Sequence, residues 1–403
     1  MSCLHRAEGY CTGSMCEEEI EFCINWKEVS RMSPQIEIQI IAVIVAVACA
    51  LPGVFLVLRK MSMMSDSITH TILLGIVLAF FVTYDLSSPL LIVGAALMGV
   101  MTVWLTEMLS RTRLLAEDAA IGVVFPLLFS IAIILITRYA GSVHLDTDSV
   151  LLGELAFAPF DRMVVGGKDI GAKAIYTTGT LLLINLSAII IFFKELKAAT
   201  FDPMLAAVLG FSPALMHYGL MTLVSLTTVG AFQAVGSVLV VAFMIGPPVT
   251  AYLLTDDLKH MLILSGGIGA INGVLGYQAA TLFDVSIAGS MAVVTGLVFL
   301  AVFIFAPRRG LIGSLLRRRT QKIEFAKTML LFHLFNHESS AEEDSKAGVD
   351  TIPAHLHWTE EFTSKIIKLL EHEGYIKLSG GLTKLTDEGR SASIHNYNSL
   401  FSK

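Results

Sequence analysis

Long apolar runs separated by short polar segments dominate the chain from about residue 36 to residue 306. A helix needs about 20 apolar residues to cross the hydrocarbon core of a bilayer. The glycine-rich stretch TTVGAFQAVGS (227–237) is either a short loop or an interruption inside the membrane. The pattern therefore predicts an all-α polytopic membrane protein with eight or nine transmembrane helices, near residues 36–58, 64–84, 88–109, 118–138, 174–194, 216–232, 236–254, 260–281 and 286–306.

The distribution of charge orients these spans. Hydrophobic residues make up 54% of the chain and charged residues only 15%, a composition typical of membrane proteins. Basic residues gather in alternate loops, which the positive-inside rule makes cytoplasmic: Arg59, Lys60, Arg111, Arg113, Lys194, Lys197, Lys259, Arg308, Arg309 and Arg317 to Arg319. Nine spans with the N-terminus outside satisfy every basic cluster, and the opposite loops contain Asp85, Asp146, Asp148, Glu154 and Asp284.

Polar segments flank the membrane region on both sides. We expect a polar N-terminal tail (1–34), a transmembrane domain (35–307), a basic linker and helix (308–340) and a small cytosolic α+β domain (341–403). The tail holds four cysteines without a CxxC pair, which gives weak support for a metal or disulfide role: Cys3, Cys11, Cys16 and Cys23.

The segment 358–393 predicts a helix followed by a hairpin. Thr359 is a candidate N-cap before apolar residues at helical spacing, and two strand-like runs flank Ser379-Gly380-Gly381. This winged-helix-like pattern resembles the recognition helix and wing of metal-responsive repressors. Residues 342–403 contain ten acidic and seven basic residues, however, and DNA binding normally requires a basic face. We therefore expect no nucleic-acid partner, and a scaffold role and a regulatory role both stay open, with a loose set of possible metal ligands in His333, His337, His355 and His357.

Asp66 and His70, in the stretch MSMMSDSITH (61–70), are the leading site candidates. Residues four apart lie on the same face of a helix. A carboxylate and an imidazole form part of a ligand set for a divalent transition metal, and ionisable groups inside membrane spans are usually functional. The alternative is that Asp66 caps the helix start while His70 packs against a neighbouring helix.

Five segments together give a family resemblance. The segment LRKMSMMSDSITHTILLGIVLAF (58–80) resembles the second span of permeases from ATP-binding-cassette importers of manganese, zinc and iron. Four more segments follow in that family's order and spacing: EDAAIGVVFPLLFSIAIILI (117–136), LLGELAF (151–157), FDPMLAAVLGFSP (201–213) and VGSVLVVAFMIGPPVTAYLL (235–254). The resemblance covers roughly residues 36 to 306.

The resemblance implies a multi-pass protein of the bacterial inner membrane, embedded in the lipid bilayer and dimerised with a second permease subunit. It also implies ATP-binding-cassette ATPase subunits in the cytoplasm and an extracytoplasmic metal-binding protein. In relatives the D-x-x-x-H motif binds the transported metal, and here its positions are Asp66 and His70. No permanently bound cofactor is implied.

A cytoplasmic segment is the expected site of ATPase coupling. Asp202-Pro203 is a helix-start signal and Gly210 a stop signal. In ATP-driven importers a short helix at this place docks into the ATPase. The expected coupling residues are Phe201, Asp202, Pro203, Ala206 and Gly210, with a plain amphipathic connector as the alternative.

Two further polar groups are weaker candidates. Gln233 either offers an oxygen to a passing ion or bridges helices by hydrogen bonds. His144, Asp146 and Asp148 either guide metal inward or are simply solvated loop residues.

Absent motifs narrow the function. The sequence contains no G-x-x-x-x-G-K-[ST] and no H-E-x-x-H, so we expect neither ATP hydrolysis by this chain nor zincin protease activity. We expect a permease subunit that transports divalent metal, with Mn²⁺ favoured because a carboxylate suits a harder ion, and Zn²⁺ or Fe²⁺ as alternatives. A membrane-tethered metal-responsive regulator and an ion-gradient-driven carrier are the competing functions.

Overall fold

The computed structural model describes residues 33–84, 88, 90–139, 155–165, 168–307, 309–338, 348–379 and 381–401. The chain divides into two compact units, Met1–Ile304 and Phe305–Lys403. Several residues considered above lie outside the described residues: the cysteines of the N-terminal tail, Asp85, His144, Asp146, Asp148, Glu154 and Arg308.

Within the described ranges, nine helices are long and apolar enough to cross a membrane. Residues 227–235 of the glycine-rich stretch continue α11, which ends at Gly236, where the φ of +80° is favourable for glycine, so a single residue separates α11 from α12. The larger of the two predicted span counts is therefore confirmed. The nine helices are α3 (Pro34–Leu58), α4 (Ser62–Thr83), α5 (Leu90–Arg111), α6 (Glu117–Tyr139), α8 (Lys173–Ile191), α11 (Pro213–Val235), α12 (Ser237–Leu254), α13 (Leu258–Phe283) and α14 (Ile287–Phe305).

Helix α3 lies at the centre of this unit and packs against α8, α12 and α13. Lipid gives no hydrophobic reason for helices to associate, so membrane helices depend on close packing. Small residues allow the backbones to approach closely enough for it. A Cβ on Gly53 of α3 would lie 2.0 Å from the carbonyl oxygen of Met244 in α12. Gly269 and Gly273 of α13 also face α3, less closely, because an added Cβ would lie 3.3 Å from Ala46 and 3.5 Å from Ala42.

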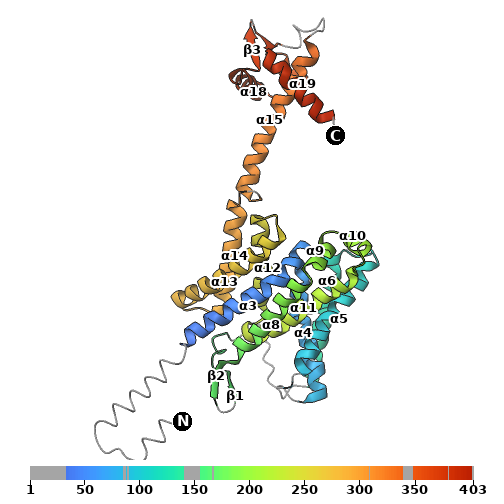
Figure 1. Cartoon of the computed structure of the whole chain (residues 1–403), viewed down its shortest axis with the longest axis vertical. Helices are drawn as coiled ribbons and strands as arrows, with labels where there is room; N and C mark the ends of the chain where they lie inside the picture. Colours follow the sequence, from blue (N-terminus) through green and yellow to red (C-terminus); the bar gives the residue numbers. More distant parts are fainter. Residues whose placement is uncertain are drawn as a thin grey trace, which may run out of the picture. The chain divides into compact units, whose positions relative to one another are not determined.

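Short elements mark the two ends of the helical bundle (Figure 1). At the end that the charge pattern makes cytoplasmic lie α9 (Phe193–Phe201) and α10 (Pro203–Val208). Near the other end, β1 (Arg162–Val165) and β2 (Lys168–Ala172) form an antiparallel hairpin. The hairpin is tied to α3 by an ion pair in which Arg162 Nη2 lies 3.4 Å from Oε1 of the buried Glu37.

The second unit has its own core. Helix α15 (Leu311–His337) packs against α18 (Glu360–His372), the antiparallel hairpin β3–β4 (Ile376–Ser379 and Leu382–Leu385) and α19 (Asp387–Phe401). Leu330, Ile352 and Ile366 are fully buried in that core. The helix and hairpin lie where the sequence pattern predicts them, with Thr359 at the N-cap position, although its side chain makes no capping hydrogen bond. Helix α19 was not predicted, and the likeness to a winged helix stays a prediction.

Candidate functional site

Asp66 and His70 lie on one face of α4, as their spacing predicts. Asp66 Oδ1 and His70 Nε2 are 3.6 Å apart, and the two side chains are 43% and 27% exposed. The residues that follow them in the sequence, Ser67 and Thr71, are buried. The pair is therefore a polar patch on the accessible face of an otherwise packed apolar helix.

The interpretation of Asp66 as a helix cap is wrong. The N-cap of α4 is Met61, and Asp66 is the fifth residue of the helix, beyond the first-turn amides that a cap satisfies. The packing interpretation of His70 holds in part, because its ring centroid lies 5.4 Å from that of Phe125 and 5.7 Å from that of Phe129, both in α6. His70 is thus held against α6 while part of its ring stays accessible.

Two side chains are too few for a complete metal site, since structural zinc sites normally use four ligands. Among the described residues, no group of three His, Cys, Asp or Glu side chains is arranged to hold a metal ion. The Asp66–His70 pair supplies one carboxylate and one imidazole, so a complete metal site needs further ligands.

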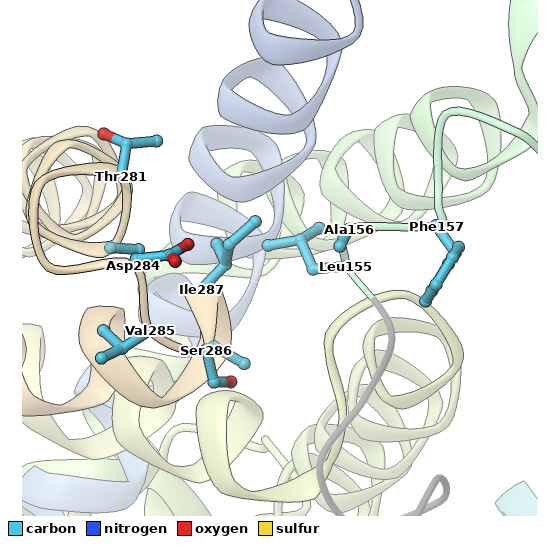
Figure 2. Close-up of a pocket in the computed structure, with 10 residues that line it drawn as sticks. Leu155, Ala156, Phe157, Thr281, Asp284, Val285, Ser286 and Ile287 are labelled. Carbon is cyan, nitrogen blue, oxygen red and sulfur yellow. The ribbon is translucent and has the colours of Figure 1, made fainter.

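Gln233 lies on a different helix, in the last turn of α11, and its side chain is exposed. The membrane unit also has a cavity of about 380 Å³ at the end that the charge pattern predicts to be external. Figure 2 shows its side chains, from the α13–α14 turn on one side and residues 155–157 on the other. The cavity offers a single carboxylate, Asp284, among mainly apolar residues, so it has too few ligands for a metal site.

The expected coupling segment forms a short capped helix. Helix α10 begins at Pro203, and the Asp202 carboxylate accepts a hydrogen bond of 2.9 Å from the Leu205 amide. Gly210 follows with φ +86°, in the left-handed conformation that ends such turns. Ala206 is buried, which fixes the helix to the bundle. The opposite side is an exposed apolar surface, with Phe201 60%, Met204 83% and Val208 84% exposed.

A polar network beside this segment was missed by the sequence analysis. Arg59 Nε donates to Thr200 Oγ1 (3.2 Å), at the end of α9, and Arg59 Nη1 lies 3.2 Å from His217 Nδ1 in α11. Glu107 of α5 accepts a hydrogen bond from the hydroxyl group of Tyr218, the residue after His217. These contacts join α3, α5, α9 and α11 at the ends nearest α10. Glu107 was detectable from sequence, because an acidic residue inside a predicted span is rarely without a function.

Comparisons with known proteins agree over the membrane unit. Residues 35–306 match the ABC 3 transport family. The chain is 47% identical over 284 residues to the manganese transport system membrane protein MntD of Bacillus subtilis, covering 70% of this chain and 96% of that protein. It is 42% identical over 355 residues to the zinc transport system membrane protein TroD of Treponema pallidum, covering 88% of this chain and 96% of that protein. This second match is longer than the family match, so it extends outside residues 35–306.

The fold is also similar to that of a solved structure. PsaBC from Streptococcus pneumoniae, in complex with Fab, superposes with a TM-score of 0.58 and 30% sequence identity. The similarity covers 72% of this chain and 97% of that one.

Proposed function

The chain belongs to the ABC 3 transport family, and from that premise we propose that it is the membrane permease subunit of an ATP-driven importer of divalent transition-metal ions. The observation that supports this most directly is the Asp66–His70 pair on the accessible face of α4. An ionised carboxylate and a neutral imidazole bind such ions, and placing them inside a membrane span is costly without a function.

The incomplete ligand set suits a transport site. A transported ion has to be released, so a site with two ligands from this chain and the remainder from water or a second permease subunit is more appropriate than a closed four-ligand site. The accessible fractions of Asp66 and His70 leave room for those ligands.

Manganese is the cargo we propose first. A carboxylate favours the harder Mn²⁺, and the relative named for manganese transport is 47% identical to this chain. Zn²⁺ is the closest alternative, because the relative named for zinc transport matches over a longer part of the chain. Fe²⁺ follows, since a relative at 28% identity is named for chelated iron transport.

We propose that α10 docks into the ATPase subunit. The apolar side chains exposed on α10 lie at the end that the positive-inside rule makes cytoplasmic. Since the sequence contains no G-x-x-x-x-G-K-[ST], ATP hydrolysis falls to a separate subunit. An extracytoplasmic metal-binding protein would deliver the ion from the other side.

The competing functions have less support. The relatives reported above are named as transport components, and none of those names supports a membrane-tethered regulator. A gradient-driven carrier would have no use for the exposed apolar helix α10.

Metal uptake by cells or vesicles containing the complete transporter tests the cargo site. We expect Asp66→Asn and His70→Ala each to abolish uptake while the protein still assembles in the membrane, because Asp66→Asn keeps the shape but removes the charge. The matched control is the exposed pair Asp257 and His260, 2.6 Å apart at the start of α13. Asp257→Asn and His260→Ala should transport normally, and normal transport by Asp66→Asn would refute the site.

Copurification with the ATPase subunit tests the docking helix. We expect Met204→Asp to weaken copurification and metal-stimulated ATP hydrolysis, since it places a charge on an 83% exposed apolar surface. Replacing Asp202 and Pro203 should have the same effect by unwinding α10. The control is Leu114→Asp, which is 86% exposed in the turn between α5 and α6. Equal retention of the ATPase by the Met204 and Leu114 variants would exclude α10 as the docking element.

A further inference from the structure

Three histidines of the second unit lie together. The ring centroid of His333 is 4.9 Å from that of His337 and 5.8 Å from that of His355. His333 and His337 are partly buried and His355 is exposed. His357, two residues after His355, is the fourth histidine of the set predicted from the sequence. Its Nδ1 lies 2.9 Å from the carbonyl oxygen of Ala354.

The hydrophobic core brings these histidines together. His333 and His337 are one turn apart near the end of α15, so both lie on the same face. His355 belongs to α17 (Ile352–Leu356), a short helix anchored by the fully buried Ile352. Ile352 packs in the same core as Leu330 and Leu334 of α15. The cluster therefore joins two elements whose backbones are already fixed.

From this geometry we propose that His333, His337 and His355 form a binding site for a late divalent transition metal such as Zn²⁺. With Zn–N bonds of about 2.0–2.1 Å and tetrahedral angles, the ring centres of two imidazole ligands lie about 5 Å apart. The two centroid distances, 4.9 Å and 5.8 Å, lie on either side of that value. In the part of the chain that the structure describes, no group of three His, Cys, Asp or Glu side chains could hold a metal ion as the side chains stand. Binding by the three histidines therefore requires rotation of at least one ring, and the exposed His355 has the space to turn.

The chemistry of the site differs from that of Asp66 and His70. Three imidazoles without a carboxylate favour Zn²⁺ over Mn²⁺. The neighbouring carboxylate of Glu338 is already engaged by Arg390, whose Nε donates to it at 2.7 Å, so the proposed site keeps an open fourth position. Such an open site binds its ion reversibly, and occupancy adds a further link between α17 and α15.

The test measures Zn²⁺ binding to the full-length permease in detergent with a chromogenic chelator as competitor. All variants contain Asp66→Asn, so the proposed cargo site does not contribute and the two proposals can fail separately. We expect one Zn²⁺ per chain, with affinity reduced at least tenfold by His333→Ala and by His355→Ala. Binding should also increase the protection of the α17 amides from hydrogen exchange.

His357→Ala is the matched control, because it removes a nearby exposed imidazole that lies outside the cluster. It should keep the parent affinity and the parent Co²⁺ spectrum, which reports tetrahedral nitrogen ligation. Since His355 is exposed, His355→Ala should not disturb folding. In the absence of metal, the hydrogen-exchange pattern of α18 should therefore be the same in this variant as in the parent, which would show that the unit is folded. Equal Zn²⁺ affinity in the His355 and His357 variants would overturn the proposal, and so would weak binding in every variant including the parent.

Discussion

Replacing Gly75 by alanine tests how closely α4 and α5 pack. A Cβ on Gly75 would lie 2.4 Å from the carbonyl oxygen of Gly94 and 2.7 Å from the Cβ of Met98. Ordinary contacts between such atoms are about 3.5–4.0 Å long. The carbonyl belongs to the backbone and cannot turn aside, so the two helices have to separate locally by about 1 Å.

The magnitude follows from two opposing terms. Overpacking of this kind costs about 1–3 kcal/mol, and the better helix propensity of alanine returns about 1 kcal/mol. Gly267 of α13 gives the control, because an added Cβ there meets nothing within 4 Å. Gly267→Ala gains the propensity term alone, so the difference between the two variants isolates the packing cost of about 1–3 kcal/mol.

The assay is reversible unfolding by SDS in mixed micelles, followed by circular dichroism. We expect Gly75→Ala to be less stable than Gly267→Ala by that difference, and to transport less, because α4 also positions His70. If the two variants have the same free energy of unfolding, the close contact of α4 and α5 does not exist as described.

Two more predictions follow from the packing, and a third concerns the role of the second unit. Asn185→Leu should destabilise the membrane unit by about 0.6–2 kcal/mol in the same SDS titration, because Asn185 Nδ2 donates to Ala48 O (2.9 Å) and to Thr227 Oγ1 (2.7 Å). Leu330→Ala should destabilise the second unit by about 2–5 kcal/mol, measured by hydrogen exchange in α18, since Leu330 is fully buried. Deletion of residues 341–403 should leave metal uptake measurable but change its dependence on internal metal, and a complete loss of uptake would contradict this.

The spans were predictable because membrane helices have a strong and simple signal. Continuous apolar length placed all nine within a few residues of their ends. The start of α10 was equally readable, because Asp202 and Pro203 act through local backbone chemistry. The unpredicted α19 has little apolar periodicity, and its first residues are polar. Its position depends instead on packing against α15.

The candidate sites were less predictable because they depend on distant residues. Spacing placed Asp66 beside His70, but the contact of His70 with Phe125 and Phe129 comes from helix packing that a sequence does not display. Likewise, His355 meets His333 only because the core folds α17 against α15. Spacing alone could not separate His355 from His357.

The turn at Gly236 limits how the membrane topology can be mapped. This buried residue is the only one between α11 and α12. Its amide donates to Phe232 O (2.9 Å), and its carbonyl accepts from the Val240 amide (3.3 Å). An inserted epitope or protease site would break both hydrogen bonds in a region with no exposed loop to absorb it. Insertions should therefore be tolerated in the exposed turn around Leu114 and rejected at Gly236. A topology map built from tolerated insertions would therefore contain no site between α11 and α12.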